Sequence, residues 1–499
     1  MLKTRVAFLV GLMIAACAPA RLERAPVKTE SAEHRRDDLT RALEGENDEH
    51  AVRNLGLWLA TAPPEGTTVN GITVRFHPGS DIIYSRYHFE RLEPSFRYDV
   101  DGFPHHQGPG IGVPMVGYRT NRHRGPNEQY YSDKLITRAV TAVAIPSKTP
   151  DGQRSVEIRL YDRHKTESIS LAGRKQTLAW DFSVPWAAQF QKSRPLNEVG
   201  FFSAFRWKAP RESGFILTED YDPRRTPVIC IHGLFSTSLV WAELTNEIWA
   251  DPALRQRYQV WHYLYPTNTP ALYSSMILRR QLEELRKSLD PDGNDPAMKR
   301  TVVVSHSLGG LLAKSLVVKP ADAFWDAFFT RPINSLNLST YERKTLEDAF
   351  FWKPCPYIDR VIFCSVPFKG STWAKSWVGK LGTHLVVEEN RFQRFFRSVD
   401  RKNPGLIRPE YRSLAEKKIT SVATLTPEDR STEVFGSLPL TPGTASHVIA
   451  GSRDLVVPAA STRIPGAESF IKVPSGHGSF DDPTAIAEIR RILALPPSR

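Results

Sequence analysis

The sequence predicts an α/β fold, a doubly wound and mostly parallel sheet, preceded by a smaller β-rich module. From Thr226 onward, short apolar runs alternate with segments of helical periodicity, which is the order of a parallel sheet covered by helices. Between about residues 61 and 200, the runs are short, alternate between apolar and polar residues and end at turn signals. The chain has 499 residues, 41% of them hydrophobic, and is therefore long enough for two separate cores.

The predicted parallel sheet belongs to a C-terminal domain at residues 201–499. Its strands are expected at 228–231, 258–265, 301–304, 360–365, 446–450 and 469–473. Helices are expected at 271–289, 308–318 and 483–493, where apolar residues recur at helical spacing or a helix follows a strand directly. About eighty residues separate the strands at 360–365 and 446–450, which is long for a simple connection. We therefore expect an inserted cap or lid at about 367–445.

The β-rich module at residues 61–200 is expected to contain short strands with turns between them. Ile72–Phe76, Thr141–Ile145 and Ser155–Leu160 have the composition of strands, and Asp151-Gly152 and Ala172-Gly173 are typical of hairpin turns. No function follows from this pattern.

Two further features of the module are a glycine-rich stretch and a histidine pair. Gly108–Pro114 is interrupted by prolines and no helical pattern follows it, so it is not a dinucleotide-binding loop. We expect a tight structural loop, which would line the access to the active site. His105 and His106 have no companion ligand at metal spacing in the sequence, so we expect an exposed pair and no metal site.

The N-terminus has the pattern of an export signal. Lys3 and Arg5 precede an apolar run, Val6–Ala16, that is too short to span a membrane. The stretch that ends at Cys17, Ile-Ala-Ala-Cys, resembles the lipobox of bacterial lipoproteins, in which the signal is cut before the cysteine and the cysteine is acylated. That resemblance implies a signal peptide at residues 1–16, lipid attachment at Cys17 and an anchor in the bacterial cell envelope. The alternative is an ordinary secretory signal with an incidental cysteine.

The segment after Cys17 is polar. Residues 17–60 are expected to form a tether followed by a weakly helical segment at Asp37–Ala60. By resemblance to enterobacterial sorting, an aspartate after the cysteine would favour the inner membrane. Ala18 stands there, which points to the outer membrane.

Charge and cysteine content exclude several classes of protein. The formal net charge is +12, but the basic residues are scattered among 54 acidic ones, and no nucleic-acid-binding module is recognisable, so we expect no nucleic-acid partner. Beyond Cys17 the cysteines are three, an odd number that does not indicate a disulfide framework. Cys230 and Cys364 lie in apolar runs and are expected to be buried. The sequence does not decide whether Cys355 and Cys364 form a disulfide. No cofactor is expected.

A candidate nucleophile follows the strand at 301–304. Val302–Gly310, read as Val-Val-Val-Ser-His-Ser-Leu-Gly-Gly, resembles the nucleophile elbow of serine α/β-hydrolases, with Ser307 as the nucleophile. The sharp turn requires small residues two positions before and two after it, and Ser305 and Gly309 meet that requirement, although a glycine is usual at the first position. If Ser305 were the nucleophile, the bulky Val303 would occupy a small position.

The same family resemblance assigns an oxyanion hole. The strand at 228–231 runs into His232-Gly233-Leu234, and in this fold such a loop donates a backbone N–H to the developing oxyanion. The resemblance implies Leu234 as one donor and Leu308, beside the nucleophile, as the other. His232 itself is expected to support the loop without a catalytic role.

A candidate acid and a candidate base follow the last two strands. Asp454 lies just past the strand at 446–450, and His477 lies in a glycine-flanked loop after the strand at 469–473. The chain order Ser, Asp, His is that of the α/β-hydrolases. A serine hydroxyl becomes a good nucleophile when an imidazole takes its proton, and an aspartate fixes that imidazole's tautomer. Asp222 and Asp359 also lie near strands, but their positions do not suit the triad.

From about Thr226 to the C-terminus, the chain resembles serine α/β-hydrolases of the bacterial lipase and esterase type. Its Ser-His-Ser-Leu-Gly-Gly stretch is also similar to the lipase-like inositol-deacylase group. Cys364–Ser371 resembles a Thr-Pro-His-x-Gly-Ser stretch of lipases, but Phe368 replaces the histidine, so only the loop's position is carried over.

The resemblance implies a serine hydrolase that cleaves carboxylic esters through an acyl-enzyme. The apolar insertion and the expected membrane anchor favour a lipid or another substrate with a hydrophobic acyl group. One alternative is amide or thioester hydrolysis by the same triad. Another is an envelope lipoprotein that uses the fold for binding only.

Overall fold

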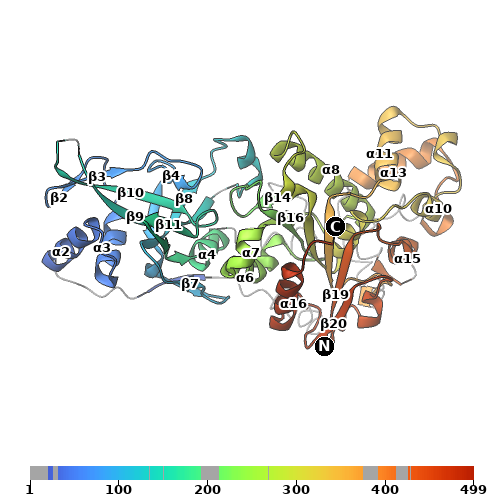
Figure 1. The fold of residues 1–499 in the computed structure, drawn as a ribbon. Helices are drawn as coiled ribbons and strands as arrows, with labels where there is room; N and C mark the ends of the chain where they lie inside the picture. Colours follow the sequence, from blue (N-terminus) through green and yellow to red (C-terminus); the bar gives the residue numbers. More distant parts are fainter. Residues whose placement is uncertain are drawn as a thin grey trace, which may run out of the picture. The chain divides into compact units, whose positions relative to one another are not determined.

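The computed structural model describes residues 21–25, 32–133, 135–149, 151–192, 213–267, 269–371, 373–374, 391–411, 425–427 and 429–498 (Figure 1). The chain divides into two compact units. The C-terminal unit includes Pro195–Trp241 and Arg257–Arg499, and the N-terminal unit consists of Ala18–Arg194 and Ala242–Gln256. The predicted signal peptide and Cys17 lie outside the described residues.

The C-terminal unit contains a seven-stranded sheet in the order β14-β16-β15-β17-β18-β19-β20. Only β14 is antiparallel to its neighbour, and the other pairs are parallel. This sheet and the β-rich region before it confirm the predicted fold class. The strands are β14 (Gly214–Leu217), β15 (Thr226–Ile231), β16 (Tyr258–Leu264), β17 (Thr301–His306), β18 (Ile358–Cys364), β19 (Ala445–Gly451) and β20 (Ser469–Val473).

Helices connect these strands. The structure has α8 (Ala271–Leu289) at the predicted bounds, and its apolar residues Met276, Leu278, Leu282 and Leu285 are buried. The helix after the candidate nucleophile, α9 (Leu308–Ser315), is shorter than predicted, and α16 (Pro483–Ala494) ends the unit.

Two segments of chain insert into this sheet's connections, where the sequence predicted one. Besides α13 (Arg391–Lys402) and α15 (Arg430–Ser437) in the predicted insertion, α10 (Ala323–Phe328) and α11 (Thr340–Phe350) lie between α9 and β18. The two segments pack together: the Phe396 ring of α13 lies 6.3 Å from the Phe350 ring, and Lys402 pairs with Glu342 at 2.8 Å. In Figure 1, α10, α11 and α13 form one helical cluster. Residues 372, 375–390, 412–424 and 428 of the predicted insertion lie outside the described residues.

The N-terminal unit contains a second seven-stranded sheet, in the order β2-β3-β10-β9-β8-β5 with β4 paired to β10. Gly152 (φ +83°) lies in the turn between β9 and β10, and Ala172 and Gly173 (φ +49° and +76°) join β11 to β12, so the predicted turns are confirmed. The strands of this sheet are β2 (Thr68–Val69), β3 (Ile72–Phe76), β4 (Ile83–Tyr84), β5 (Arg91–Pro94), β8 (Val113–Thr120), β9 (Leu135–Lys148) and β10 (Arg154–Asp162). β11 (Ser168–Leu171) and β12 (Arg174–Thr177) pair with each other in a separate two-stranded sheet.

The N-terminal unit also takes a piece of chain from between β15 and β16. This piece forms α6 (Ala242–Ala250) and α7 (Pro252–Arg257). Its Trp249 packs edge-on against Trp186 of α4 (Ser183–Lys192), with 5.2 Å between ring centroids, and Arg255 pairs with Glu167. The unit is therefore not one continuous stretch of sequence.

Three expectations for the N-terminal region are corrected. Part of the expected tether is a strand, because β1 (Arg21–Arg24) pairs with β6 (Tyr98–Asp101). The expected helix at 37–60 is two helices, α2 (Ala32–Leu43) and α3 (Glu49–Leu59), because Asp48 caps α3. The histidine pair has carboxylate partners that are distant in sequence: His105 contacts Asp181 at 2.9 Å and His106 contacts Glu247 at 2.6 Å. Both side chains are partly buried, with 24% and 28% of their surface exposed.

The glycine-rich loop belongs to the N-terminal unit. It joins β7 (Gln107–Gly108) to β8, and a Cβ on Gly110 would lie 2.3 Å from the backbone of Ala179. The close approach explains the glycine. No helix in the described part of the chain is both long enough and apolar enough to cross a membrane.

Candidate active site

Ser307 occupies the sharp turn between β17 and α9. Its backbone has φ +51° and ψ −125°, a strained conformation for a residue with a side chain. A Cβ on Gly309 would lie 2.3 Å from the carbonyl oxygen of His232, so the turn requires glycine there. Ser305 lies in β17, fully buried, and its hydroxyl donates to the carbonyl of Ile362 at 3.2 Å.

The loops after β19 and β20 bring Asp454 and His477 to Ser307. His477 Nε2 lies 2.9 Å from Ser307 Oγ, and His477 Nδ1 lies 2.9 Å from Asp454 Oδ2. Since an ionised carboxylate only accepts hydrogen bonds, Nδ1 carries the ring proton and Nε2 accepts from the serine hydroxyl. The structure thus joins the three predicted side chains in one hydrogen-bonded chain.

Hydrogen bonds from His477 and from the backbone hold Asp454 in its ionised form. Its Oδ1 accepts the N–H groups of Val456 and Val457, each at 2.8 Å. Burial disfavours the charged carboxylate, but the hydrogen bond from His477 and the two backbone N–H groups outweigh it. The pKa of Asp454 therefore lies below its ordinary value.

His306 contacts both the backbone carbonyl and the ring of His477, a positioning role that the sequence analysis missed. Its Nε2 lies 2.8 Å from the backbone carbonyl of His477, and its ring lies 4.8 Å from the His477 ring and 4.5 Å from Phe480. Burial and the neighbouring His477 lower the pKa of His306 to about 3, so the ring is neutral and Nε2 donates to the carbonyl. The available signal was its position, directly before the candidate nucleophile.

The loop after β15 lies against Ser307. A Cβ on Gly233 would lie 2.6 Å from His306 Nδ1 and 3.0 Å from Ser307 Cβ, so glycine is required for this close approach. His232 Nε2 accepts the N–H of Tyr265 at 3.3 Å, and its Nδ1 donates to the carbonyl of Gly233 at 2.9 Å. Burial lowers the pKa of His232 to about 4. These contacts tie a neutral His232 into the loop itself.

The two backbone N–H groups predicted for the oxyanion hole belong to Leu234 in this loop and Leu308 at the start of α9. Within the described part of the chain, neither N–H donates a hydrogen bond. The next N–H, that of Phe235, is directed to Thr267 Oγ1 at 3.4 Å, and Phe235 has a φ of +56°. The loop therefore changes direction directly after Leu234.

Ser307, His477 and Leu234 line one small pocket of about 20 Å³, which is room for about one water molecule. The remaining lining residues are mostly apolar: Phe235, Pro367, Ser371, Trp373, Ala374, Leu425, Val456 and Val457.

Asp222 and Asp359, the two aspartates whose sequence positions did not suit the triad, form other interactions. Asp222 pairs with Arg224, and Asp359 accepts hydrogen bonds from Ser498. Cys230, Cys355 and Cys364 are free, and Cys230 and Cys364 are buried. Among the described residues, no group of three or more His, Cys, Asp or Glu side chains is placed to hold a metal ion.

Several solved structures are similar to part of this chain at low sequence identity. The mature lipase BlEst2 of Bacillus licheniformis has 15% identity and a TM-score of 0.33, over 57% of this chain and 97% of that one. The esterase RhEst1 of Rhodococcus sp. ECU1013 has 14% identity and a TM-score of 0.30, over 57% of this chain and 98% of that one. A putative aryl esterase of Burkholderia cenocepacia has 15% identity and a TM-score of 0.28, over 57% and 93%.

No curated protein matches the chain. A model of the alpha/beta hydrolase family matches residues 228–489, more than half of the 499 residues. The matched range includes Ser307, Asp454 and His477 and the loop that carries Leu234. The chain therefore belongs to the alpha/beta hydrolase family.

Proposed function

We propose that this hydrolase is a serine enzyme that cleaves carboxylic esters with hydrophobic acyl groups, through an acyl-enzyme on Ser307. The observation that carries the proposal is the hydrogen-bonded chain Ser307–His477–Asp454, with 2.9 Å at each step. A serine in this arrangement loses its proton to the imidazole as it attacks.

In the first half of the reaction, Ser307 Oγ attacks the ester carbonyl carbon and His477 Nε2 takes the hydroxyl proton. The carbonyl oxygen becomes an oxyanion, which the Leu234 and Leu308 N–H groups stabilise. When the tetrahedral intermediate collapses, the bond to the alkoxy group breaks and His477 returns the proton to the leaving alcohol. Each oxyanion donor contributes on the order of 3–4 kcal/mol to lowering the barrier.

In the second half, water takes the place of the alcohol. His477 removes a proton from the water, the hydroxide attacks the acyl carbon, and the bond to Ser307 Oγ breaks. The carboxylic acid leaves and the serine regains its proton. Throughout, Asp454 keeps the proton of His477 on Nδ1 and stabilises the imidazolium that forms.

The pocket lining supports a hydrophobic acyl group. Leu234, Phe235, Leu425 and the two valines after Asp454 place apolar surface beside Ser307. Such a surface favours burial of an alkyl chain by about 0.8 kcal/mol for each CH₂ group. Nothing in the triad alone separates an ester from an amide or a thioester, so those substrates belong in the same test.

The test compares wild type, Ser307→Ala and Ser305→Ala on p-nitrophenyl esters of graded chain length, with a matched amide and a matched thioester. We expect ester hydrolysis that is lost in Ser307→Ala and kept in Ser305→Ala. Preferential cleavage of the amide or thioester would assign that bond to the enzyme instead. Correctly folded protein that cleaves none of them, with or without detergent, would favour a binding function.

We also propose that the mature protein is lipid-anchored through Cys17 in the bacterial cell envelope, at the outer membrane. The support is the sequence around Cys17 alone. Metabolic labelling with a palmitate analogue should mark the wild-type protein and leave Cys17→Ala unlabelled, and fractionation should recover the label with the outer membrane. Equal labelling of both proteins would contradict the assignment.

A further inference from the structure

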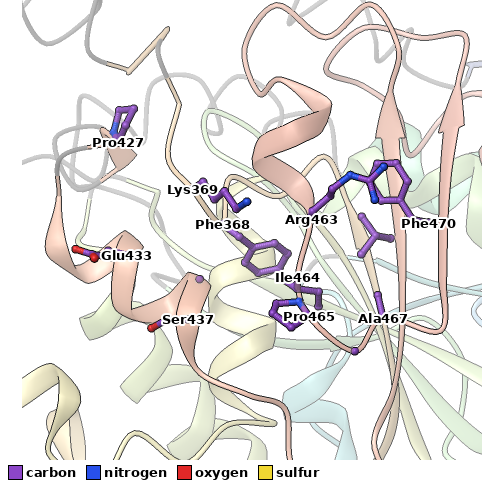
Figure 2. A pocket seen from close by; sticks show the side chains of 13 residues that line it. Phe368, Lys369, Pro427, Glu433, Ser437, Arg463, Ile464, Pro465, Ala467 and Phe470 are labelled. Carbon is purple, nitrogen blue, oxygen red and sulfur yellow. The ribbon is translucent and has the colours of Figure 1, made fainter.

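A second hollow in the C-terminal unit does not contain the triad. It is a cavity of about 750 Å³, bounded by α15, by the loop after β18 and by the chain around β19 and β20 (Figure 2). Its lining residues are Phe368, Lys369, Pro427, Glu433, Gly436, Ser437, Val448, Arg463, Ile464, Pro465, Gly466, Ala467 and Phe470. None of them has a part in the proposed reaction.

The cavity is apolar with two cations at its surface. Figure 2 shows the Phe368 ring near the middle, with Ile464 and Pro465 beside it. The Arg463 guanidinium lies 3.9 Å from the centre of the Phe470 ring, and Lys369 lies next to Phe368 in the sequence. Among the described residues, neither Lys369 nor Arg463 forms an ion pair, and both are exposed. A ligand with an apolar part and an anionic group would match this lining.

A buried lysine lies behind the apolar floor. Lys314 of α9 is fully buried, its Nζ lies 4.9 Å from the centre of the Phe368 ring, and it donates to the carbonyl of Gly436 at 3.2 Å. In the described part of the chain, no carboxylate pairs with it. Glu433 is the one carboxylate that lines the cavity, and Figure 2 places it on the α15 side, away from Arg463. Among the lining residues, the cations Lys369 and Arg463 therefore outnumber the single carboxylate.

The cavity shares a wall with the Ser307 pocket. In the loop after β18, Pro367 and Ser371 line the pocket, whereas Phe368 and Lys369 line the cavity. A Cβ on Gly370 would lie 2.5 Å from the backbone of Pro427, so the loop and the 425–427 segment are in close contact. One loop thus separates the site of acyl transfer from a second, cationic hollow.

We propose that this cavity binds a single-chain amphipathic carboxylate, with its carboxylate at Lys369 and Arg463 and its chain over Phe368, Ile464 and Phe470. The preference for an anion with one alkyl chain rests on the cavity, whose size suits one chain better than a two-chain phospholipid. The choice of a carboxylate rests on the proposed function, because ester hydrolysis releases such an acid on the other side of the shared wall.

The test measures equilibrium binding of dodecanoate, below its micelle concentration, to the full chain carrying Ser307→Ala. Dodecanol at the same concentrations is the neutral comparison, and inorganic phosphate and a short-chain phosphatidylglycerol are the other anions. The cavity variant is Lys369→Gln with Arg463→Gln. The matched control is Lys299→Gln with Arg300→Gln, an exposed pair that lines neither hollow. Thermal melts check that all variants are folded.

We expect saturable binding of dodecanoate that is at least about tenfold tighter than that of dodecanol. The cavity variant should weaken it about tenfold or more, and the control should change it less than about twofold. Equal affinity in the cavity variant, or equal binding of dodecanol, would overturn the proposal, as would tighter binding of phosphate or phosphatidylglycerol. The binding assay uses the Ser307→Ala protein and does not depend on catalysis. Failure of dodecanoate binding and failure of ester hydrolysis are therefore separate results.

Discussion

Asp454→Asn should move the ring proton of His477 from Nδ1 to Nε2 while leaving the positions of the three side chains unchanged. Asp454 Oδ1 accepts two backbone N–H groups, those of Val456 and Val457, and Oδ2 accepts the His477 Nδ1–H. An asparagine has one oxygen for these three donors. We expect the oxygen to remain with the two backbone groups, because turning the amide NH₂ toward them would leave two buried donors unsatisfied, at about 1–3 kcal/mol each.

The NH₂ of the new side chain would then face His477 Nδ1. His477 would have to accept there and carry its proton on Nε2, where it could no longer take a proton from Ser307. In triads of this type the same exchange lowers kcat by about 10⁴-fold, or about 5.5 kcal/mol of transition-state stabilisation. We therefore expect Asp454→Asn to lower kcat/KM on a p-nitrophenyl ester about 10³- to 10⁴-fold, with KM nearly unchanged.

The assay combines steady-state hydrolysis with the rate of fluorophosphonate labelling, which should fall in parallel. Asp359→Asn is the matched control, because Asp359 is a buried carboxylate in β18 that accepts hydrogen bonds from Ser498 and not from His477. It should retain activity within about threefold. A loss of less than tenfold in Asp454→Asn, or an equal loss in the control, would refute the tautomer argument.

Three further substitutions test other parts of the structure. Lys314→Met should raise the melting temperature, because an unpaired buried cation costs about 1–4 kcal/mol. Burial lowers the pKa of Lys314 to about 7. The unfolded chain therefore binds the extra proton between pH 7 and the ordinary lysine pKa, and wild-type stability rises with pH across that window. The advantage of Lys314→Met should be greatest at or below pH 7 and shrink toward pH ~10, and a constant advantage in melts across pH would contradict it.

His306→Phe keeps a ring against Phe480 but loses the hydrogen bond to the His477 carbonyl, so kcat should fall about tenfold with KM unchanged, a change of about 1.4 kcal/mol. An unaltered kcat would contradict a positioning role for His306. Gly309→Ala places a Cβ 2.3 Å from a carbonyl oxygen and should destabilise the fold by more than about 3 kcal/mol in denaturant titrations. An unchanged midpoint would argue against this geometry of the turn.

The parallel sheet and the order of the candidate residues were predictable because both depend on local patterns. Apolar runs marked the six parallel strands, and α8 has the bounds that its periodicity predicted. Ser307 directly follows β17, while Asp454 and His477 lie in the loops that follow β19 and β20. The C-terminal ends of parallel strands meet at one edge of the sheet. Their positions in the sequence were therefore enough to predict that the three side chains lie near one another.

What the sequence did not reveal depends on contacts between distant segments. β14 is a four-residue strand whose pairing with β16 no local pattern signals. His105 and His106 appeared to lack partners because Asp181 and Glu247 lie far along the chain. Likewise, the two inserted segments come together through Phe350 and Phe396, and neither segment's periodicity identifies the other.

The central claim is that Ser307 is an activated nucleophile, and covalent labelling tests it most directly. Purified protein is treated with a fluorophosphonate, and the modified residue is located by peptide mass spectrometry in wild type, Ser307→Ala and Ser305→Ala. The account predicts a single adduct on Ser307 in wild type and Ser305→Ala, and none in Ser307→Ala. An adduct on another serine, or folded wild-type protein that stays unmodified in both buffer and detergent, would contradict it.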